Sequence, residues 1–348
     1  MPRLRINATD DGLQQHGSAV PLAAIPQDMM AQGSAAVILV HGYKYEPGHP
    51  SHCPHHKIFN DGPDGWPNGV QRDGTGKDRL IVAFGWPARG ALVHTHRRAA
   101  ALGRALAILV QTLREAAPHR PVHIMAHSLG SEIALSALAY LPAYAVQRMV
   151  LLTGASFTTR AQDMIATAAG RTTEVFNITS RENDLFDLMF ETLIPAPRIR
   201  DRAIGQGLVG ANVVNLQLDC PATLDALAHL DLPIAHSARR ICHWSSYTRP
   251  GVMALYSRLL HGPSDLRLGR LTAMLPRHAQ PRWSQLRTFL PDLQTRPPMA
   301  ANWATAARHL CAKTYRLWAA QRPDTPQAPT LTCSHPSRPW TGKTTSPS

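Results

Sequence analysis

The sequence contains few cysteines, no membrane-length apolar run and no internal repeat, and each of these absences excludes a class of protein. The 5 cysteines among 348 residues are scattered and odd in number, which argues against a disulfide scaffold and for a reducing compartment. A membrane-spanning helix needs about 20 apolar residues, whereas the longest candidate, residues 99–110, is broken by Arg104. Solenoids and propellers require repeats. Because the first residues carry no apolar run typical of a signal peptide, we expect a soluble, cytoplasmic protein.

Charged residues make up only 17% of the chain, and their distribution is uneven. Hydrophobic residues reach 44%, enough for a large core, which excludes a disordered or coiled-coil protein. Residues 264–348 hold 12 Lys and Arg against 3 Asp and Glu, so that this last quarter carries +9 of the net charge of +13. A basic segment suggests an anionic partner. No zinc-finger spacing or aromatic RNA-binding signature accompanies it, and we expect no nucleic-acid partner.

Short apolar runs alternate with helical patterns along the first 263 residues. Such near-continuous apolar strands, separated by helices, predict an α/β fold with a mostly parallel sheet covered by helices on both faces. The first strand is less apolar, and we expect it to pair antiparallel at an edge. Residues 43–79 and 203–213 are expected to be loops. The expected strands are 3–8, 36–41, 80–84, 122–126, 146–152, 173–179 and 213–219, and the expected helices are 95–116, 128–140, 161–169 and 184–193.

The composition changes after residue 263, which predicts three parts. Residues 1–263 form the α/β domain, residues 264–321 form a basic extension, and residues 322–348, rich in Pro, Ser and Thr, form a disordered tail. Residues 300–321 show the pattern of an amphipathic helix, with one apolar and one basic face. Such a helix fits an anionic membrane surface, but we favour docking of its apolar face onto the body. The sequence does not predict the oligomeric state.

The strongest motif lies in residues 122–140, where an apolar strand runs through Ser128 directly into a helix. A turn this tight holds the serine in a strained conformation, exposes its hydroxyl and directs the next backbone N–H into the same space. The flanking residues must be small, and Ala126 and Gly130 meet that requirement. An ordinary helix cap is the alternative interpretation of Ser128.

This motif resembles the G-x-S-x-G nucleophile elbow of the α/β-hydrolase superfamily, with Ala126 in place of the first glycine. Residues 36–43, AVILVHGY, are similar to the strand and His-Gly turn that supply the oxyanion hole in that family. The resemblance covers residues 3–262. It implies that Ser128 is the nucleophile, that the backbone N–H groups of Tyr43 and Leu129 form the oxyanion hole, and that Gly42 permits the close approach.

The resemblance also implies an acid and a histidine, in that order, after the serine. Asp184 follows the expected strand 173–179 at its carboxyl end, where ligands bind in open α/β sheets. Asp187 remains the main alternative, and Glu182 and Asp219 are less favoured. For the base we predict His243, which lies in a polar aromatic loop before a helical segment. His236 is the runner-up, while His229 lies in an apolar helical stretch and fits a structural role.

Two further segments have more than one interpretation. Residues 49–56 contain four histidines and Cys53, residue types that bind zinc or copper. Neither C-x-x-C nor H-E-x-x-H spacing is present, so we favour a polar loop at the mouth of the site and expect no metal. The apolar residues of 185–194 form either a lid over an acyl pocket or a helix packed on the sheet.

Together these features predict a serine hydrolase that cleaves a carboxylic ester or a related acyl bond of a small-molecule substrate. Ser128, Asp184 and His243 would form the triad, and no cofactor is expected. The same triad also serves acyltransferases and peptidases, and a fold does not determine the reaction. A binding protein that keeps the fold without catalysis is the alternative from another class.

Overall fold

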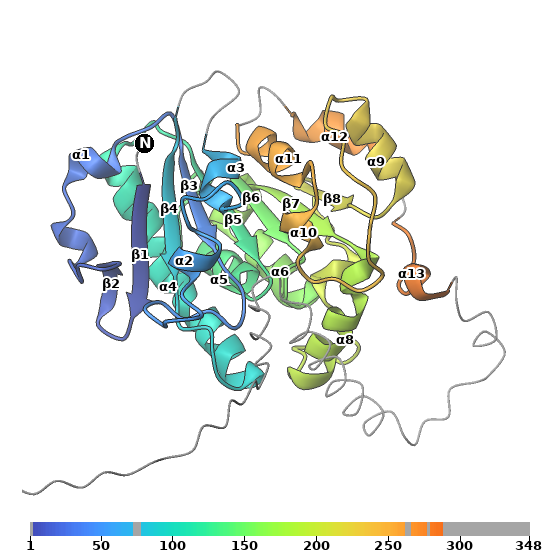
Figure 1. Ribbon diagram of the computed structural model, residues 1–348, viewed down its shortest axis with the longest axis horizontal. Coiled ribbons are helices and arrows are strands. Elements are labelled where there is room, and N and C mark those ends of the chain that lie inside the picture. Colours follow the sequence, from blue (N-terminus) through green and yellow to red (C-terminus); the bar gives the residue numbers. More distant parts are fainter. Residues whose placement is uncertain (1–2, 72–77, 262–265, 277–278, 288–348) are drawn as a thin grey trace, which may run out of the picture. The chain divides into compact units, whose positions relative to one another are not determined.

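The computed structural model describes residues 3–71, 78–261, 266–276 and 279–287. An eight-stranded sheet runs through it in the order β2-β1-β4-β3-β5-β6-β7-β8 (Figure 1). All neighbouring strands are parallel except β1 and β2, which form an antiparallel hairpin. The strands are β1 (Arg3–Thr9), β2 (Gly12–Gln15), β3 (Ala36–Val40), β4 (Leu80–Gly85), β5 (Val122–His127), β6 (Arg148–Leu152), β7 (Glu174–Thr179) and β8 (Val213–Gln217).

Helices connect the parallel strands and cover the sheet. The longest, α4, has 25 residues and packs closely along α5. The α-helices of the described residues are α1 (Gln27–Met30), α2 (Pro54–Lys57), α3 (Trp66–Val70), α4 (Leu92–Ala116), α5 (Gly130–Ala137), α6 (Thr158–Ile165), α7 (Ala168–Thr172), α8 (Asp184–Leu193), α9 (Pro221–Ala228), α10 (Ser245–Thr248), α11 (Val252–Leu259), α12 (Leu268–Met274) and α13 (Ser284–Arg287).

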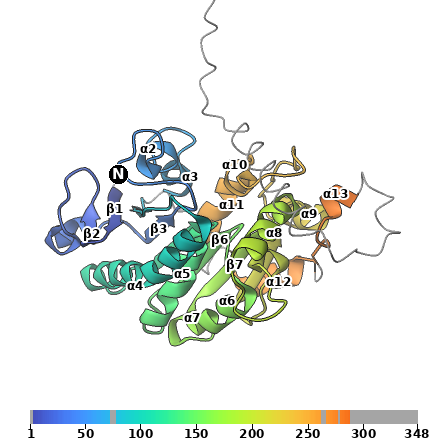
Figure 2. The ribbon, with the colours of Figure 1, turned by 90° about the horizontal axis from the view of Figure 1, so that it is seen from below.

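The sheet has a hydrophobic core on each face. Side chains alternate along a strand, so Ile38 of β3 joins one core with residues of α4, α5 and α6, while Val37 and Leu39 join the other with residues of α3, α9 and α11. Figure 2 shows α4 and α5 on the opposite side of the sheet from α10 and α11. Both faces of β3, β4 and β5 are buried throughout. This explains why their sequences are apolar without alternation.

The prediction of a mostly parallel sheet with helices on both faces is confirmed, but its edge differs from expectation. We expected the first strand to be an antiparallel edge strand. It does pair antiparallel, with β2, but it also pairs parallel with β4 and so lies inside the sheet, and the edge is β2, which the sequence did not predict. Only Leu13 of its four residues is buried, so the pattern was too short to predict a strand. The segment 43–79 is also more than a loop, because it contains α2 and α3 and buries Phe59 and Trp66.

Residues 266–287, where described, contact the body of the protein. Leu266 and Leu271 are buried in the core on the α11 face. The buried guanidinium of Arg148 pairs with Glu174 at 2.6 Å and donates to the carbonyl oxygens of Leu259 and Leu266, each at 2.6 Å. The domain boundary after residue 263 stays a prediction, and 300–321 and 322–348 lie outside the described residues. No helix of the described part is long and apolar enough to cross a membrane.

We predict that Arg148→Ala lowers the free energy of unfolding by about 3 kcal/mol, since it leaves Glu174 and two carbonyl groups without their donor. Urea denaturation followed by circular dichroism measures this loss. Arg104→Ala is the control, because Arg104 is exposed on α4 and its loss should change the stability by less than about 0.5 kcal/mol. Equal stabilities of the two variants would show that the Arg148 network contributes nothing.

Candidate active site

Ser128 lies in the turn between β5 and α5, in a backbone conformation that a serine rarely adopts. Its φ is 53°, in the left-handed region. The Ser128 N–H donates to Leu152 O at 3.1 Å, and the Ser128 carbonyl accepts from Ala155 N at 3.0 Å. The loop that follows β6 therefore holds the turn in this conformation. Such strain, fixed by its surroundings, is characteristic of functional residues.

The turn after β3 touches the serine turn, as the sequence predicts for an oxyanion hole. A Cβ at Gly42 would lie 2.7 Å from the Ser128 Cβ, and a Cβ at Gly130 would lie 2.6 Å from the His41 carbonyl oxygen. Both positions therefore require glycine. Leu129 is the N-cap of α5, so that no carbonyl group of the helix accepts its N–H.

His41 orients this turn, a role that the sequence analysis missed. Its Nε2 accepts from the Trp86 N–H at 3.0 Å, so Nδ1 carries the proton and donates to Gly42 O at 2.8 Å. The C=O and N–H of a trans peptide point in opposite directions. Fixing the Gly42 carbonyl therefore also fixes the direction of the Tyr43 N–H. Burial lowers the pKa of His41 to about 3, so the ring stays neutral. The only signal in the sequence was the His-Gly pair itself.

His243 lies in the loop before α10, and hydrogen bonds hold that loop beside the serine turn. Its carbonyl accepts from His127 Nε2 at 3.1 Å and from Thr153 Oγ1 at 3.5 Å. The His127 and His243 ring centroids are 4.6 Å apart, and Phe186 stacks on His243 at 4.7 Å. No hydrogen bond joins Ser128 Oγ and His243 among the described residues. Catalytic hydrogen bonds of this kind often tighten only around substrate.

Asn183, not Asp184, is the hydrogen-bond partner of the His243 ring. His243 Nδ1 donates to Asn183 Oδ1 at 2.6 Å. The Asp184 carboxylate instead accepts from Arg181 Nη1 at 3.2 Å and from Trp283 N at 2.6 Å. The structure thus places the His243 loop against His127, the neighbour of Ser128, but gives the Asp184 carboxylate other partners than the His243 ring. The resemblance to α/β hydrolases points to an acid, hence to Asp184 or Asp187, and no signal in the sequence points to the amide of Asn183 beside them.

Asp187 lies directly behind Asn183. Asn183 Nδ2 donates to Asp187 Oδ1 at 2.9 Å, while Asp187 Oδ2 is buried without a hydrogen-bond partner. A Cβ at Gly205 would collide with this second oxygen. The buried polar groups thus form a chain from Asp187 through Asn183 to His243.

The other candidate acids and histidines have structural roles or lie elsewhere. The buried Glu182 carboxylate pairs with Arg249 and accepts from Ser180 Oγ and Ser245 Oγ. Asp219 caps the β7 turn through the Arg181 N–H. His229 bonds to the Asp225 carbonyl of its own helix, and His236 is exposed.

The charge of Asp187 determines which nitrogen of His243 carries a proton. An ionised carboxylate can only accept, so Asn183 must direct its NH2 group toward Asp187 and its oxygen toward His243. The His243 proton then lies on Nδ1, and Nε2 keeps a free lone pair. Burial and the nearby His127 lower the pKa of His243 well below its ordinary value, so the ring is neutral at neutral pH. A neutral imidazole with a free Nε2 is the form that a general base requires.

Helix α8 presents apolar side chains beside His243. Phe190 is buried and packs on Phe157 at 4.8 Å, so part of the helix belongs to the core. Leu185, Phe186 and Met189 are only half-buried. Helix α8 therefore packs on the body, as one of the two sequence interpretations predicts, and Phe186 lies beside the imidazole, whereas the lid over an acyl pocket stays a prediction.

We predict that Asp187→Asn removes the preference of His243 for the Nδ1–H tautomer, because two facing amides can hydrogen-bond in either orientation. Long-range ¹H–¹⁵N NMR correlation distinguishes the tautomers, and His243→Gln assigns the signals. The exchange variant Asn183→Asp/Asp187→Asn should restore a single tautomer, since a carboxylate at position 183 only accepts. An unchanged tautomer in Asp187→Asn would contradict this role.

The same spectra should depend on pH in the wild type. Burial raises the pKa of Asp187 to about 7, so the carboxyl gains a proton as the pH falls through 7. A protonated Asp187 carboxyl can donate to Asn183 Oδ1. The Asn183 side-chain amide can then rotate so that its NH2 group faces His243. We therefore expect the Nδ1–H tautomer to dominate above pH 7 and to lose population below it.

Comparison with known proteins agrees with the fold. Residues 26–181, less than half of the chain, match a family model described as "Alpha/beta hydrolase of unknown function (DUF900)". No curated protein sequence matches. A Trichoderma reesei cutinase in complex with a C11Y4 phosphonate inhibitor is similar over 42% of this chain, with 14% identity and a TM-score of 0.25, and the matched part spans only 61% of the cutinase.

The lin2722 gene product of Listeria innocua is similar over 65% of this chain and 93% of its own, with 11% identity and a TM-score of 0.37. Neither solved structure is similar enough to support a conclusion about function. The family match falls on the part of the sheet that carries both the oxyanion turn and the serine turn. The chain therefore has the α/β-hydrolase fold, and its residues 26–181 are similar to an α/β-hydrolase family.

Proposed function

We propose that the protein is a serine hydrolase that cleaves a carboxylic ester or a related acyl bond. Ser128 is the nucleophile, His243 the general base, and Asn183 with Asp187 orients the imidazole in place of Asp184. The observation that carries this proposal is the strained Ser128 at a strand–helix turn, in contact with Gly42. A serine that served only as a helix cap would need neither the left-handed φ nor the glycine beside it.

The reaction proceeds in two halves. His243 Nε2 removes the Ser128 proton as Oγ attacks the carbonyl carbon of the substrate, and the carbonyl π electrons move onto oxygen. The tetrahedral intermediate collapses, the ester C–O bond breaks, and the leaving alkoxide takes the proton from His243. Water, deprotonated by the same Nε2, then attacks the acyl-serine ester. Collapse of the second intermediate returns the proton to Ser128 Oγ and releases the carboxylic acid.

The Tyr43 and Leu129 N–H groups would stabilise the oxyanion of both intermediates. Each such donor contributes roughly 3–4 kcal/mol to transition-state stabilisation in well-studied hydrolases. The direction of the Tyr43 N–H depends on His41, through the hydrogen bond to the Gly42 carbonyl. His41 is thus a positioning residue for the oxyanion hole.

This site differs from a Ser-His-Asp triad because the imidazole is hydrogen-bonded to the amide of Asn183 and not to a carboxylate. The Asn183 oxygen fixes the tautomer but carries no charge, so it stabilises the imidazolium less than a carboxylate would. The negative charge of Asp187 lies one hydrogen bond further away.

The substrate class follows from the surroundings of His243. Phe186 stacks on the ring, and the neighbouring α8 side chains are apolar and half-buried. A charged acyl group would lose hydration against this surface without gaining a partner. We therefore propose an uncharged, apolar acyl group.

Ser128→Ala should abolish covalent labelling by a fluorophosphonate probe, because the probe requires an activated serine. Ser136→Ala is the matched control, since Ser136 lies further along α5 and its hydroxyl bonds to Glu132. Mass spectrometry of the intact variants measures the label. If the wild-type protein is not labelled, it is a binding protein without catalysis. If Ser128→Ala is still labelled, the nucleophile is another residue.

Asn183→Ala should lower kcat for p-nitrophenyl esters by at least about 10²-fold, because the imidazole loses its tautomer and orientation. Asp184→Asn should leave kcat within a few-fold, since its carboxylate contacts Arg181 and Trp283 instead of His243. Circular dichroism and KM serve as controls for folding and binding. If Asp184→Asn loses as much activity as Asn183→Ala while both fold, Asp184 is the catalytic acid.

The activity of the wild-type enzyme toward p-nitrophenyl esters of increasing acyl chain length tests whether the acyl group is apolar.

A further inference from the structure

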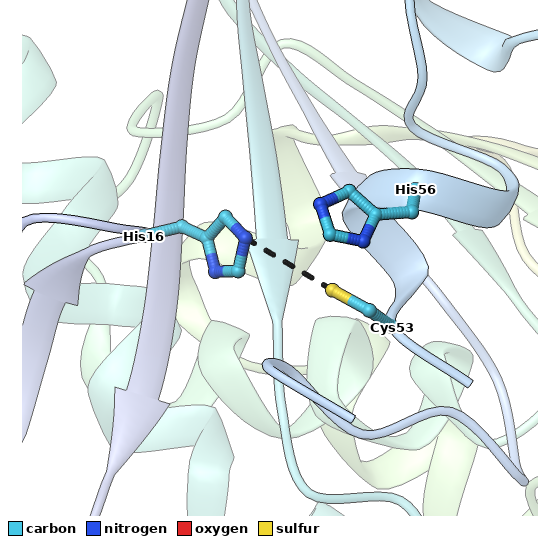
Figure 3. Close-up of side chains that lie close together, drawn as sticks. All are labelled: His16, Cys53 and His56. Carbon is cyan, nitrogen blue, oxygen red and sulfur yellow. Dashed lines mark hydrogen bonds between the residues drawn. The ribbon is translucent and has the colours of Figure 1, made fainter. Parts of the chain in front are cut away.

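A second cluster of reactive side chains lies at the hairpin edge of the sheet. His16, Cys53 and His56 direct one ligand atom each toward a common point, and all three atoms lie within 4.8 Å of one another (Figure 3). His16 follows β2, whereas Cys53 and His56 belong to the first turn of α2. The histidine-rich segment in the sequence suggested a metal but lacked a fitting pattern, because the third side chain comes from 37 residues upstream.

The spacing of Cys53 and His56 allows both side chains to bind one metal ion. Cys53 is the N-cap of α2 and His56 follows three positions later, so one helical turn brings both side chains to the same side. Cys53 is fully buried, and its sulfur lies 4.0 Å from His16 Nε2. Donors in a tetrahedral zinc site with one sulfur lie roughly 3.5 Å apart. A contraction of about half an ångström would bring His16 Nε2 and Cys53 Sγ to that distance, and His56 is exposed.

The groups behind His16 also suit a metal ligand. The Asn7 amide lies between two rings, 3.1 Å from His16 Nδ1 and 2.8 Å from His55 Nε2. Turning this amide over lets His16 Nδ1–H donate to Asn7 Oδ1, which leaves the lone pair of His16 Nε2 facing Cys53. Ligating histidines usually donate their second N–H to an oxygen in this way. His55 stacks on His16 with ring centroids 4.1 Å apart and fixes the plane of the ring.

Electrostatics favours neutral donors and one thiolate. His16 and His56 each offer an imidazole nitrogen, and Cys53 offers its sulfur. A bound divalent cation would favour the deprotonated thiol of Cys53. One thiolate and two imidazoles are donors for zinc or copper, whereas magnesium and calcium require oxygen.

We propose that His16, Cys53 and His56 form a zinc(II) site that ties the β1–β2 hairpin to α2. Three protein donors leave the fourth tetrahedral position to water. From this site, ring contacts lead through His55 and Phe59 to His41, the residue that orients the oxyanion turn. The metal would therefore stiffen the long segment that follows the oxyanion turn. The proposal does not depend on the hydrolase activity.

Titration of the metal-free full-length protein with cobalt(II), followed by zinc(II), tests the site. Cobalt bound to Cys53 should give a thiolate charge-transfer band and intense visible bands at one equivalent, and zinc should displace both. Zinc at 100 times its dissociation constant should raise Tm by about 5 °C. His56→Ala should weaken binding at least about tenfold and reduce the rise in Tm. Because His56 is exposed, this variant should keep the Tm of the metal-free wild type.

Two further variants separate this site from adventitious binding by the many histidines. Cys53→Ser should lose the charge-transfer band. His49→Ala is the matched control, because His49 lies in the same segment but packs on His52 outside the cluster, and it should bind as wild type. The absence of a thiolate band in wild type, a band that survives in Cys53→Ser, or binding lost in His49→Ala but kept in His56→Ala would each overturn the proposal.

Discussion

The candidate site depends on the close approach of two turns at the carboxyl ends of β3 and β5. Neither Gly42 nor Gly130 has room for a Cβ, and Ser128 between them adopts a left-handed φ. The neighbouring strands β3 and β5 are parallel, so both turns emerge at the same edge of the sheet. The loop after β6 adds hydrogen bonds to both sides of Ser128. This packing places the serine hydroxyl beside the backbone N–H groups proposed to form the oxyanion hole.

A second constraint is the buried chain of polar groups behind the imidazole. The Asp187 carboxylate can only accept, so the Asn183 amide must direct its NH2 group toward it. The amide oxygen then faces His243, whose single proton must lie on the facing nitrogen. Asp187 thereby acts on His243 without touching it. In the proposed active site, two residues divide the tasks that a single aspartate performs in a Ser-His-Asp triad. The tautomer is fixed by a neutral oxygen, and the charge lies further from the ring.

The fold and the strained turn at Ser128 could be predicted because they depend on local patterns. Continuous apolar strands, the small residues around Ser128 and the His-Gly pair are all visible in short windows of sequence. The acid could not be chosen in this way, because Asn183, Asp184 and Asp187 lie within one helical turn and only their tertiary contacts distinguish them. The same reason applies to β2, which is too short for a pattern, and to His16, which reaches Cys53 only through the hairpin pairing.

A crystal structure of the protein after reaction with a phosphonate ester tests the central claim most directly. The account predicts a covalent bond from phosphorus to Ser128 Oγ and a phosphoryl oxygen within hydrogen-bond distance of the Tyr43 and Leu129 N–H groups. It also predicts that Asn183 still bridges His243 and Asp187. An unmodified Ser128, or a phosphoryl oxygen directed away from these N–H groups, would contradict it.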